Sequence, residues 1–372
     1  MKTPGVTIDD RPLGPPPIEG VSTTTAGMTG VAERGPEEPQ LITSWREYQD
    51  LFGGFVDGGF LPAAVKGFFD NDGRRVYVAR ATDARAGLAA LEAIDEIAIL
   101  LAPDEVMDSS GTITNAVIDQ CERLRDRFAI VSAPGNRDRI QDLRPPRDSA
   151  FAAFYYPWVR VLDPLRQPAG AAATILVPPG GHVAGIYARS DIERGVQKAP
   201  ANEDVRGLAA GKTGSHDAPL EFTVTKAEQD ILNPHGVNVI RDFRDAERGI
   251  RLWGARTMSS DSTWKYVNVR RLFIFVEQSI DKGTRWVLFE PNAESTWANV
   301  RRIVTNFLVQ LWRDGALLGT TSDEAFFVKC DRTTMTQDDI DNGRLICLIG
   351  IAPVRPAEFV IFRVRQNTAD SH

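Results

Sequence analysis

The sequence predicts a two-domain protein, an α/β domain followed by an α+β domain, with an extended strand arm at each end. Three observations lead to this prediction. The chain has 372 residues, enough for two domains with separate cores. Strand-like and helix-like segments alternate from Val21, and from Leu232 two long amphipathic helices are combined with short strands. Apolar strand-like runs stand close to both ends of the chain.

Residues 1–20 are predicted to form a linking arm. A short strand-like run contains Val6, Thr7 and Ile8, and the proline-rich segment 11–20 follows it. Val6 and Ile8 alternate with Thr7, so one face of the strand is apolar. Consecutive prolines favour extended polyproline II and exclude a helix. We therefore expect a stiff tether that holds the first strand away from the following domain instead of closing a local hairpin.

Residues 21–231 are predicted to form an α/β domain. The alternation of strands and helices is typical of a largely parallel sheet. Ser44 and Pro62 suit the first turns of two of the helices. The polar, aperiodic residues 196–220 predict a surface excursion before the second domain. The predicted strands are 21–31, 76–79, 97–101, 128–132 and 152–155, and the predicted helices are 45–52, 63–70 and 115–127.

Residues 232–356 are predicted to form an α+β domain in which two helices cover one face of a sheet. The first helix, 262–280, carries a continuous apolar stripe and is expected to end at Gly283. The apolar run 285–290 predicts a buried strand after it. The remaining predicted elements are a helix over 291–314, strands over 325–330 and 345–351, and a short acidic helix over 336–342.

Residues 357–372 are predicted to form a second linking strand. Both faces of this strand begin apolar, and a free strand of this kind promotes aggregation. An assembly that always pairs the strand with a sheet in another copy removes this hazard. The residues predicted to take part in the pairing are Phe359, Val360, Ile361, Phe362 and Val364.

Charge and composition exclude several function classes. A net charge of −7 does not favour nucleic acid or an anionic membrane as a partner. No stretch approaches the roughly 20 apolar residues that span a bilayer, and the N-terminus lacks the apolar region of a secretory signal. Cys121, Cys330 and Cys347 are scattered and odd in number, which predicts buried thiols instead of a disulfide framework. We therefore expect synthesis and folding in a reducing cytoplasm.

An ordered set of segments resembles the contractile tail sheath family of phages and related injection systems. The resemblance covers both ends and most of the second domain, whereas residues 81–200 carry it mainly through their α/β pattern. The chain has little room for the extra outer domains of large phage sheaths, so it resembles a minimal sheath. The matching segments are 4–6, 19–26, 33–36, 68–71, 248–257, 266–271, 330–335 and 356–359.

This resemblance implies a structural, non-enzymatic subunit without a cofactor. Sheath subunits lend their terminal strands to neighbours, polymerise helically around an inner tube, and contract to drive the tube through a target envelope. Residues 21–231 would form the outer domain, and residues 232–356 the inner domain that faces the tube. The implied partners are further copies of the chain in stacked rings, the inner tube protein, and baseplate and terminal cap proteins. The implied particle is a phage tail or tail-like particle assembled in a bacterial cytoplasm.

Two arginine pairs are candidates for contact with an acidic inner tube. Arg270 and Arg271 are predicted on the outward face of the first long helix, and Arg301 and Arg302 on that of the second. The alternative is that both pairs are solvated helix faces without a partner.

A function from another class is a nucleotide-dependent α/β enzyme that uses residues 90–215. The segment 207–213 resembles a phosphate-binding loop, but Arg206 stands where that loop needs glycine, and no strand precedes it. The four histidines share no metal-ligand spacing with each other or with the cysteines. We therefore expect no catalytic residue, cofactor or metal, and prefer the structural subunit.

Overall fold

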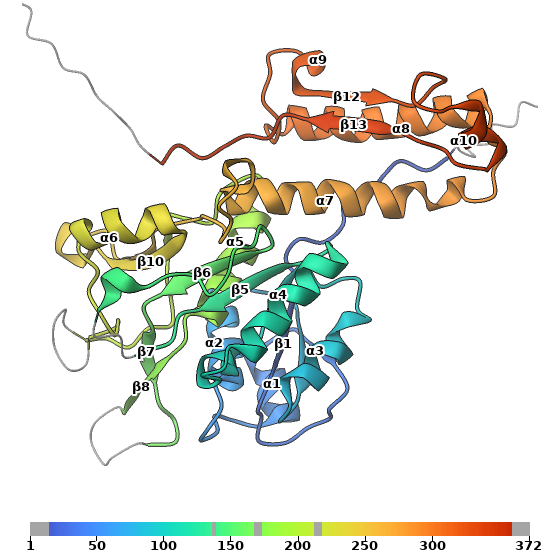
Figure 1. The fold of residues 1–372 in the computed structure, drawn as a ribbon. Helices are drawn as coiled ribbons and strands as arrows, with labels where there is room; N and C mark the ends of the chain where they lie inside the picture. Colours follow the sequence, from blue (N-terminus) through green and yellow to red (C-terminus); the bar gives the residue numbers. More distant parts are fainter. Residues whose placement is uncertain (1–14, 136–138, 167–172, 212–217, 359–372) are drawn as a thin grey trace, which may run out of the picture.

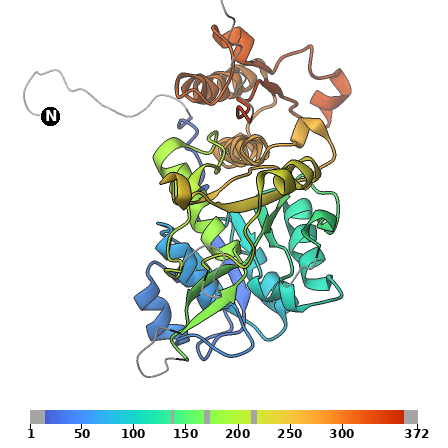
Figure 2. The same cartoon turned by 90° about the vertical axis from the view of Figure 1, so that its left-hand side faces the viewer.

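The computed structural model describes residues 15–135, 139–166, 173–211 and 218–358. A large α/β domain and a smaller α+β domain are stacked, with a long helix, α7 (Val267–Thr284), between them (Figure 1). The view turned by 90° shows the same stacking (Figure 2). This architecture confirms the predicted fold class. The residues predicted to form the linking strands, Val6 to Ile8 and Phe359 to Val364, lie outside the described residues.

The large domain is built on a sheet of nine described strands. They are β1 Ala26–Gly30, β2 Gln40–Ile42, β3 Val76–Arg80, β4 Ile99–Leu101, β5 Phe128–Ser132, β6 Ala152–Tyr156, β9 Glu203–Asp204, β10 Val237–Asp242 and β11 Ile250–Leu252. The order across the sheet is β2-β3-β1-β4-β5-β6-β10-β11-β9. The strands from β3 to β10 run parallel, and β2, β11 and β9 pair antiparallel at the edges. The chain moves from β1 first to β3 and then to β4, so the order reverses beside β1.

Helices cover both faces of this sheet. The elements are α1 Trp45–Phe52, α2 Leu61–Asp70, α3 Ala84–Glu92, η1 Pro103–Met107, α4 Thr112–Leu124, η2 Ile140–Asp142, α5 Gly180–Arg194, α6 Lys226–Leu232, η3 Asn233–His235 and η4 Arg244–Ala246, with a hairpin of β7 Val159–Leu162 and β8 Thr174–Val177. Thr29 of β1 lies against Gly87 of α3, and the next residue, Gly30, lies against Leu61 of α2. Successive strand residues point to opposite faces, so α3 and α2 cover opposite sides. Ser44 caps α1 as predicted, accepting from the Glu47 N–H at 3.2 Å.

The smaller domain packs α8 between α7 and a two-stranded sheet. Its elements, besides α7, are η5 Ser262–Trp264, η6 Arg285–Val287, α8 Glu294–Arg313, α9 Ser322–Ala325, β12 Phe326–Lys329, α10 Gln337–Asp341 and β13 Leu348–Ile351. Leu272 and Val276 of α7 share one buried core with Val304 and Leu308 of α8. Thr336 caps α10 and exchanges side-chain-to-backbone hydrogen bonds with Asp339, which confirms the predicted helix start.

The boundary between the two domains lies further along the chain than predicted. Residues 237–252 were expected in the second domain, but β10 pairs with β6 and carries β11 at the edge of the large sheet. The predicted division at 231/232 is therefore wrong. A parallel pairing between strands about 80 residues apart leaves no local pattern in the sequence.

Two details of the α7–α8 connection also differ from the prediction. The run 285–290 forms the 3₁₀ turn η6 and an exposed loop instead of a buried strand, and Leu288 is 68% exposed. The run has no neighbouring strand among the described residues, so its apolar composition alone was misleading. Helix α7 also continues through Gly283 to Thr284.

Candidate assembly interface

The small sheet of the second domain is the candidate site of assembly. β12 and β13 pair antiparallel, with Phe326 opposite Ile351. Phe326 and Val328 face the core beneath α8, whereas Phe327 and Leu348 are each 51% exposed. Among the described residues, this sheet ends at its two strands. An isolated two-stranded sheet is marginally stable in water, so this one offers edges on which a further strand can add.

The described part of the proline-rich tether, residues 15–20, lies on helix α7. The side chain of Ile18 is buried in the second domain's core, where a Cβ at Gly283 would lie 2.7 Å from Ile18 Cγ1. A Cβ at Gly20 would lie 2.8 Å from the ring of Phe275. The Val21 N–H donates to Ser279 Oγ at 3.1 Å. The tether was predicted to hold the arm away from the following domain, but its described part lies on the second domain.

The start of the predicted C-terminal linking strand, 357–372, is fixed by a largely buried ion pair of Glu358. Arg256 donates to both carboxylate oxygens of Glu358, with distances of 2.8 and 2.6 Å, and the Tyr266 hydroxyl donates to Glu358 at 3.1 Å. Burial alone raises the pKa of Glu358, but hydrogen bonds and charge from Arg256 outweigh it and lower the pKa. The described parts of both predicted linking segments, residues 15–20 and 357–358, are thus anchored on the subunit.

Neither Arg256 nor Glu358 was predicted to anchor the chain. The visible signal is Glu358 itself, a charged residue at the start of the otherwise apolar run 357–362. Its partner, Arg256, lies about 100 residues earlier in the chain, and nothing in the local sequence pattern connects the two.

Arg270 and Arg271 are buried, so their predicted outward orientation is wrong. Arg271 forms a two-point ion pair with Asp191 of α5, at 2.7 and 3.1 Å, in which the two side chains are 3% and 1% exposed. Arg270 lies over the rings of Phe151 and Trp264, 4.4 Å from each centroid. Helix α7 is covered on its polar side by the large domain, so these arginines join the two domains.

Arg301 and Arg302 are exposed on α8, as predicted. Arg301 Nη1 donates to the backbone oxygen of Cys330 at 3.5 Å. Arg302 lies at the rim of a groove of about 440 Å³ between the tether and α8. The groove is lined by apolar side chains such as Ile18 and Phe307 and by polar ones such as Asn306. This pair is placed where a partner can reach it.

The C-terminal edge of the parallel sheet is closed by two carboxylates of η1. Asp104 accepts from the Val31 N–H at 2.8 Å and from the Phe60 N–H at 2.5 Å. Glu105 accepts from the Ser132 N–H at 2.9 Å. Burial raises the pKa of both carboxyl groups, to about 8 for Glu105, although these hydrogen bonds lower it.

The positions of Asp104 and Glu105 are relevant to the alternative function, a nucleotide-dependent α/β enzyme. Open α/β sheets bind ligands outside the carboxyl ends of their strands, at the point where the strand order reverses. Here that point lies beside β1, and Asp104 ties the loop after β1 to the residue before α2. The described residues contain no group of three or more His, Cys, Asp or Glu side chains arranged to hold a metal ion. Both carboxylates at this edge accept hydrogen bonds from backbone N–H groups.

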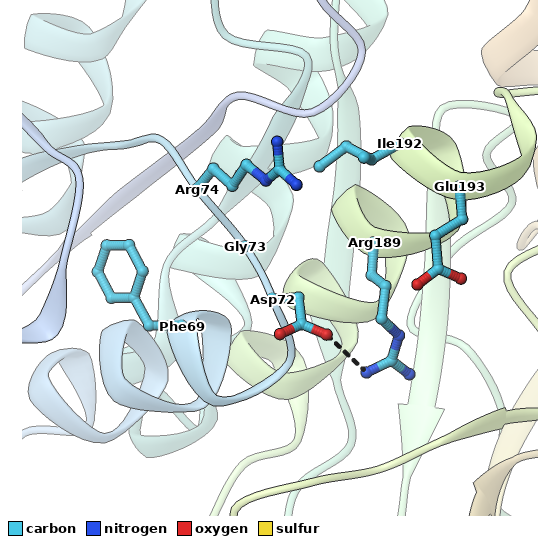
Figure 3. A pocket seen from close by; sticks show the side chains of 7 residues that line it. All are labelled: Phe69, Asp72, Gly73, Arg74, Arg189, Ile192 and Glu193. Atoms are coloured by element: carbon cyan, nitrogen blue, oxygen red, sulfur yellow. Dashed lines mark ion pairs between the residues drawn. The ribbon is translucent and has the colours of Figure 1, made fainter.

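A hollow of about 320 Å³ lies between the ends of α2 and α5 (Figure 3). Its lining contains the positively charged Arg74 and Arg189 and the negatively charged Asp72 and Glu193, and Arg74 points toward Ile192. Arg189 Nη1 lies 3.9 Å from Asp72 Oδ2, the pair drawn as a dashed line. Arg206 also pairs with Asp72, and Asn71 binds the Arg206 backbone. The start of the predicted phosphate-loop-like segment is therefore tied to the end of α2.

None of the described helices combines the length and apolar character that crossing a bilayer requires.

Comparison with known families gives two adjoining matches. Residues 78–258 match the family model of the phage tail sheath protein central domain, and residues 259–367 match that of the phage tail sheath C-terminal domain. The boundary between the matches follows β11, in agreement with the sheet topology. Together they cover well over half of the chain.

Solved structures and curated proteins lead to the same group. The sheath complex of an extracellular contractile injection system in the contracted state has 31% identity and a TM-score of 0.80, covering 99% of this chain and 98% of that chain. The contracted helical sheath of the anti-feeding prophage has 33% identity and a TM-score of 0.79, covering 99% and 100%. A protein of Pseudomonas aeruginosa described as a prophage major tail sheath protein is 26% identical over 97% of this chain and 95% of its own length. The chain spans only 37% of the tail sheath protein of Salmonella phage ViI, at 27% identity.

Proposed function

This chain belongs to the phage tail sheath family, and we propose that it polymerises helically around an inner tube by exchanging strands between subunits. It is a structural subunit of a contractile sheath in a phage tail or tail-like particle, and it is not an enzyme. We further propose that contraction of the polymer drives the tube through a target envelope. The observation that carries the strand exchange is the incomplete small sheet.

Strand exchange gives the small sheet the strands that it needs. Its two described strands cover one side of α8 but offer edges with free backbone groups, to which an extended segment adds by main-chain hydrogen bonding. Val6, Thr7 and Ile8 from one neighbour, and Phe359, Val360, Ile361, Phe362 and Val364 from another, are the segments proposed to fill these edges. Because each contact joins different surfaces, repetition produces an open helix or stacked rings.

Rigid subunits joined by arms can be repacked without unfolding. The buried contacts of Arg270 and Arg271 hold the two domains of a subunit together, so contraction is proposed to change the packing between subunits. A free-energy difference of a few kcal/mol per subunit, summed over many coupled copies, suffices without nucleotide hydrolysis.

We assign four regions to the assembled sheath. Residues 1–20 are the N-terminal linking arm and residues 357–372 the C-terminal linking strand. The α/β domain is proposed to lie outside, and the α+β domain inside, facing the tube. The sheet topology supports moving the division between these domains from 231/232 to about residue 258.

Arg301 and Arg302 are the remaining candidates for contact with the tube, because Arg270 and Arg271 are buried. The further proposed partners are the inner tube protein and the baseplate and terminal cap proteins. We propose that assembly takes place in the bacterial cytoplasm. Nucleic acid and membrane insertion have no part in this function.

The test is electron microscopy of sheath co-expressed with the inner tube protein of its particle. The full chain is expected to form striated tubes. A truncation that lacks residues 1–14 keeps Ile18 and Val21 on α7, so it is expected to fold with an unchanged melting temperature but to form no ordered tubes. Ordered tubes from this truncation would overturn exchange of the N-terminal strand.

A matched pair of substitutions tests the strand register. Val6→Asp with Ile8→Asp places charge on the apolar face of the arm, whereas Thr7→Asp places it on the other face. We expect the first variant to abolish tubes and the second to retain them. Equal effects of both variants would argue against a strand with one buried face.

A further inference from the structure

Two cysteines lie opposite each other at the end of the small sheet. Lys329 of β12 is opposite Leu348 of β13 in the antiparallel ladder. One step further along the same register, Cys330 is opposite Cys347. Both are free thiols in this structure, Cys330 buried and Cys347 half-buried.

The position in the ladder brings these two side chains close together. The Ala352 N–H donates to the Ala325 oxygen at 2.8 Å, which marks a hydrogen-bonded pair in the same register. Hydrogen-bonded and non-hydrogen-bonded pairs alternate along an antiparallel ladder. Cys330 and Cys347 are five steps away and therefore form a non-hydrogen-bonded pair. Such pairs have Cα atoms about 4.5 Å apart, within the range of about 4.4–6.8 Å that a disulfide spans.

The surroundings favour reaction between the two sulfurs. The Cys347 thiol interacts with Cys330, and together with the charge of Arg301 this lowers the pKa of Cys330 although burial raises it, whereas the same interaction and burial raise the pKa of Cys347. Thr334 holds the connecting loop, because its hydroxyl donates to the Ile346 oxygen at 2.8 Å. The third cysteine, Cys121, is buried in helix α4 of the other domain.

We propose that Cys330 and Cys347 are an oxidation site that forms an intrachain disulfide across β12 and β13 in the presence of a small-molecule disulfide such as oxidised glutathione. The half-buried Cys347 sulfur passes its proton to Cys330 and attacks one sulfur of the reagent, forming a mixed disulfide and releasing one glutathione thiolate, which takes up that proton. The Cys330 thiolate then attacks the Cys347 sulfur and releases the second glutathione. Two thiols are oxidised, one reagent disulfide is reduced, and the two protons leave with the released glutathione.

The disulfide covalently joins the strands on which neighbouring arms are proposed to add. In a reducing cytoplasm the pair stays as thiols. In an oxidising medium the bond closes the loop between the two strands, so that the small sheet stays paired without strands from neighbours. The site therefore stabilises the small domain specifically after exposure to an oxidant.

The test uses the full chain, reduced with dithiothreitol, freed of reductant and incubated in its folded state with oxidised glutathione. We expect thiols counted in denaturant to fall from three to one and the mass to fall by about 2 Da. Trypsin digestion should give one peptide containing Cys330 joined to one containing Cys347. Three remaining thiols, a link through Cys121, or only glutathionylated protein would overturn the proposal.

Two single variants, Cys121→Ser and Cys347→Ser, test which cysteines form the disulfide. Cys121→Ser is expected to form the same bond, with no thiols left after oxidation. Cys347→Ser changes the half-buried partner, so it should fold and show no intrachain link. The oxidised wild-type chain should melt at a higher temperature than the reduced chain, and Cys347→Ser should lose this difference. A difference that persists in Cys347→Ser would contradict the assigned bond.

Discussion

At the scale of single residues, Arg271 and Asp191 hold the two domains together. We expect Arg271→Ala to lower the free energy of unfolding by about 3–5 kcal/mol, because it leaves the Asp191 carboxylate buried without its partner. The double variant with Asp191→Asn should recover part of this loss. Urea unfolding measures both changes. A loss of stability in the double variant that exceeds the sum of the losses in the two single variants would contradict the role of the pair.

Glu105 makes the stability fall with rising pH. Its folded pKa is about 8, above the ordinary value of 4.5, because of burial. Between these values the folded state keeps a proton that the unfolded state has released. The stabilisation that Glu105 gives to the folded state is therefore complete below about pH 4.5. It is lost as the pH rises toward 8, at about 1.4 kcal/mol per pH unit. Glu105→Gln should remove this slope in urea unfolding series measured from pH 6.5 to 8, and an unchanged slope would contradict the assignment.

His182 acts in the opposite direction. Its ring lies against Gly67 between α5 and α2, and burial lowers its pKa to about 4. In the unfolded state the His182 ring binds a proton near pH 6.5, whereas in the folded state it binds one only near pH 4. Stability is therefore lost as the pH falls from 6.5 to 4. We expect His182→Phe to flatten this acid side of the profile. Between pH 4.5 and 6.5 the two slopes oppose each other, so each needs its own variant.

The burial of Arg270 and Arg271 could not be predicted from the sequence. Arg270 and Arg271 were placed on an outward face because charged side chains on an amphipathic helix usually face water. Their actual partners, Phe151 and Asp191, belong to the other domain. A single sequence gives no sign of which polar helix face a second domain will cover.

At the scale of elements, α7 explains why Gly283 was misinterpreted. Glycine near a helix end commonly stops the helix, but here it remains helical and gives room for Ile18 of the tether. By contrast, α10 and α1 were predicted correctly from Thr336 and Ser44, because a capping residue acts on its own next turn. Helix starts set by a neighbouring capping residue could be predicted from the sequence, whereas contacts between segments far apart in the chain could not.

The contact between Ile18 and Gly283 predicts that Gly283→Ala changes the free energy of unfolding in opposite directions in the wild type and in the Ile18→Ala variant. Ile18→Ala should destabilise the chain by about 2 kcal/mol through the cavity that it leaves. Gly283→Ala should destabilise the wild type, because its Cβ would lie 2.7 Å from Ile18 Cγ1. In the Ile18→Ala background the same substitution should stabilise by about 0.5–1 kcal/mol through helix propensity. Urea unfolding of the four proteins tests this, and the same sign in both backgrounds would show that Ile18 does not lie on Gly283.

At the scale of the whole molecule, the fold class and the family resemblance were predictable, but the division of the chain was not. Alternating strands and helices identified the α/β domain, and two amphipathic helices identified the second domain. β10 and β11 looked like part of the second domain because they follow a long irregular stretch. Their place depends on pairing with β6, which only the assembled sheet determines.

Burial of Arg270 and Arg271 leaves Arg301 and Arg302 to test contact with the tube. Reversing both charges, with Arg301→Glu and Arg302→Glu, should reduce the amount of sheath that copurifies with tubes about tenfold or more, because attraction to an acidic surface becomes repulsion. Arg313→Glu, at the exposed end of the same helix, is the matched control and should retain binding. Raising the salt concentration should weaken the wild-type contact, since exposed charges are screened. Unchanged copurification of the doubly reversed protein, with its melting temperature intact, would place the tube contact on another face of the domain.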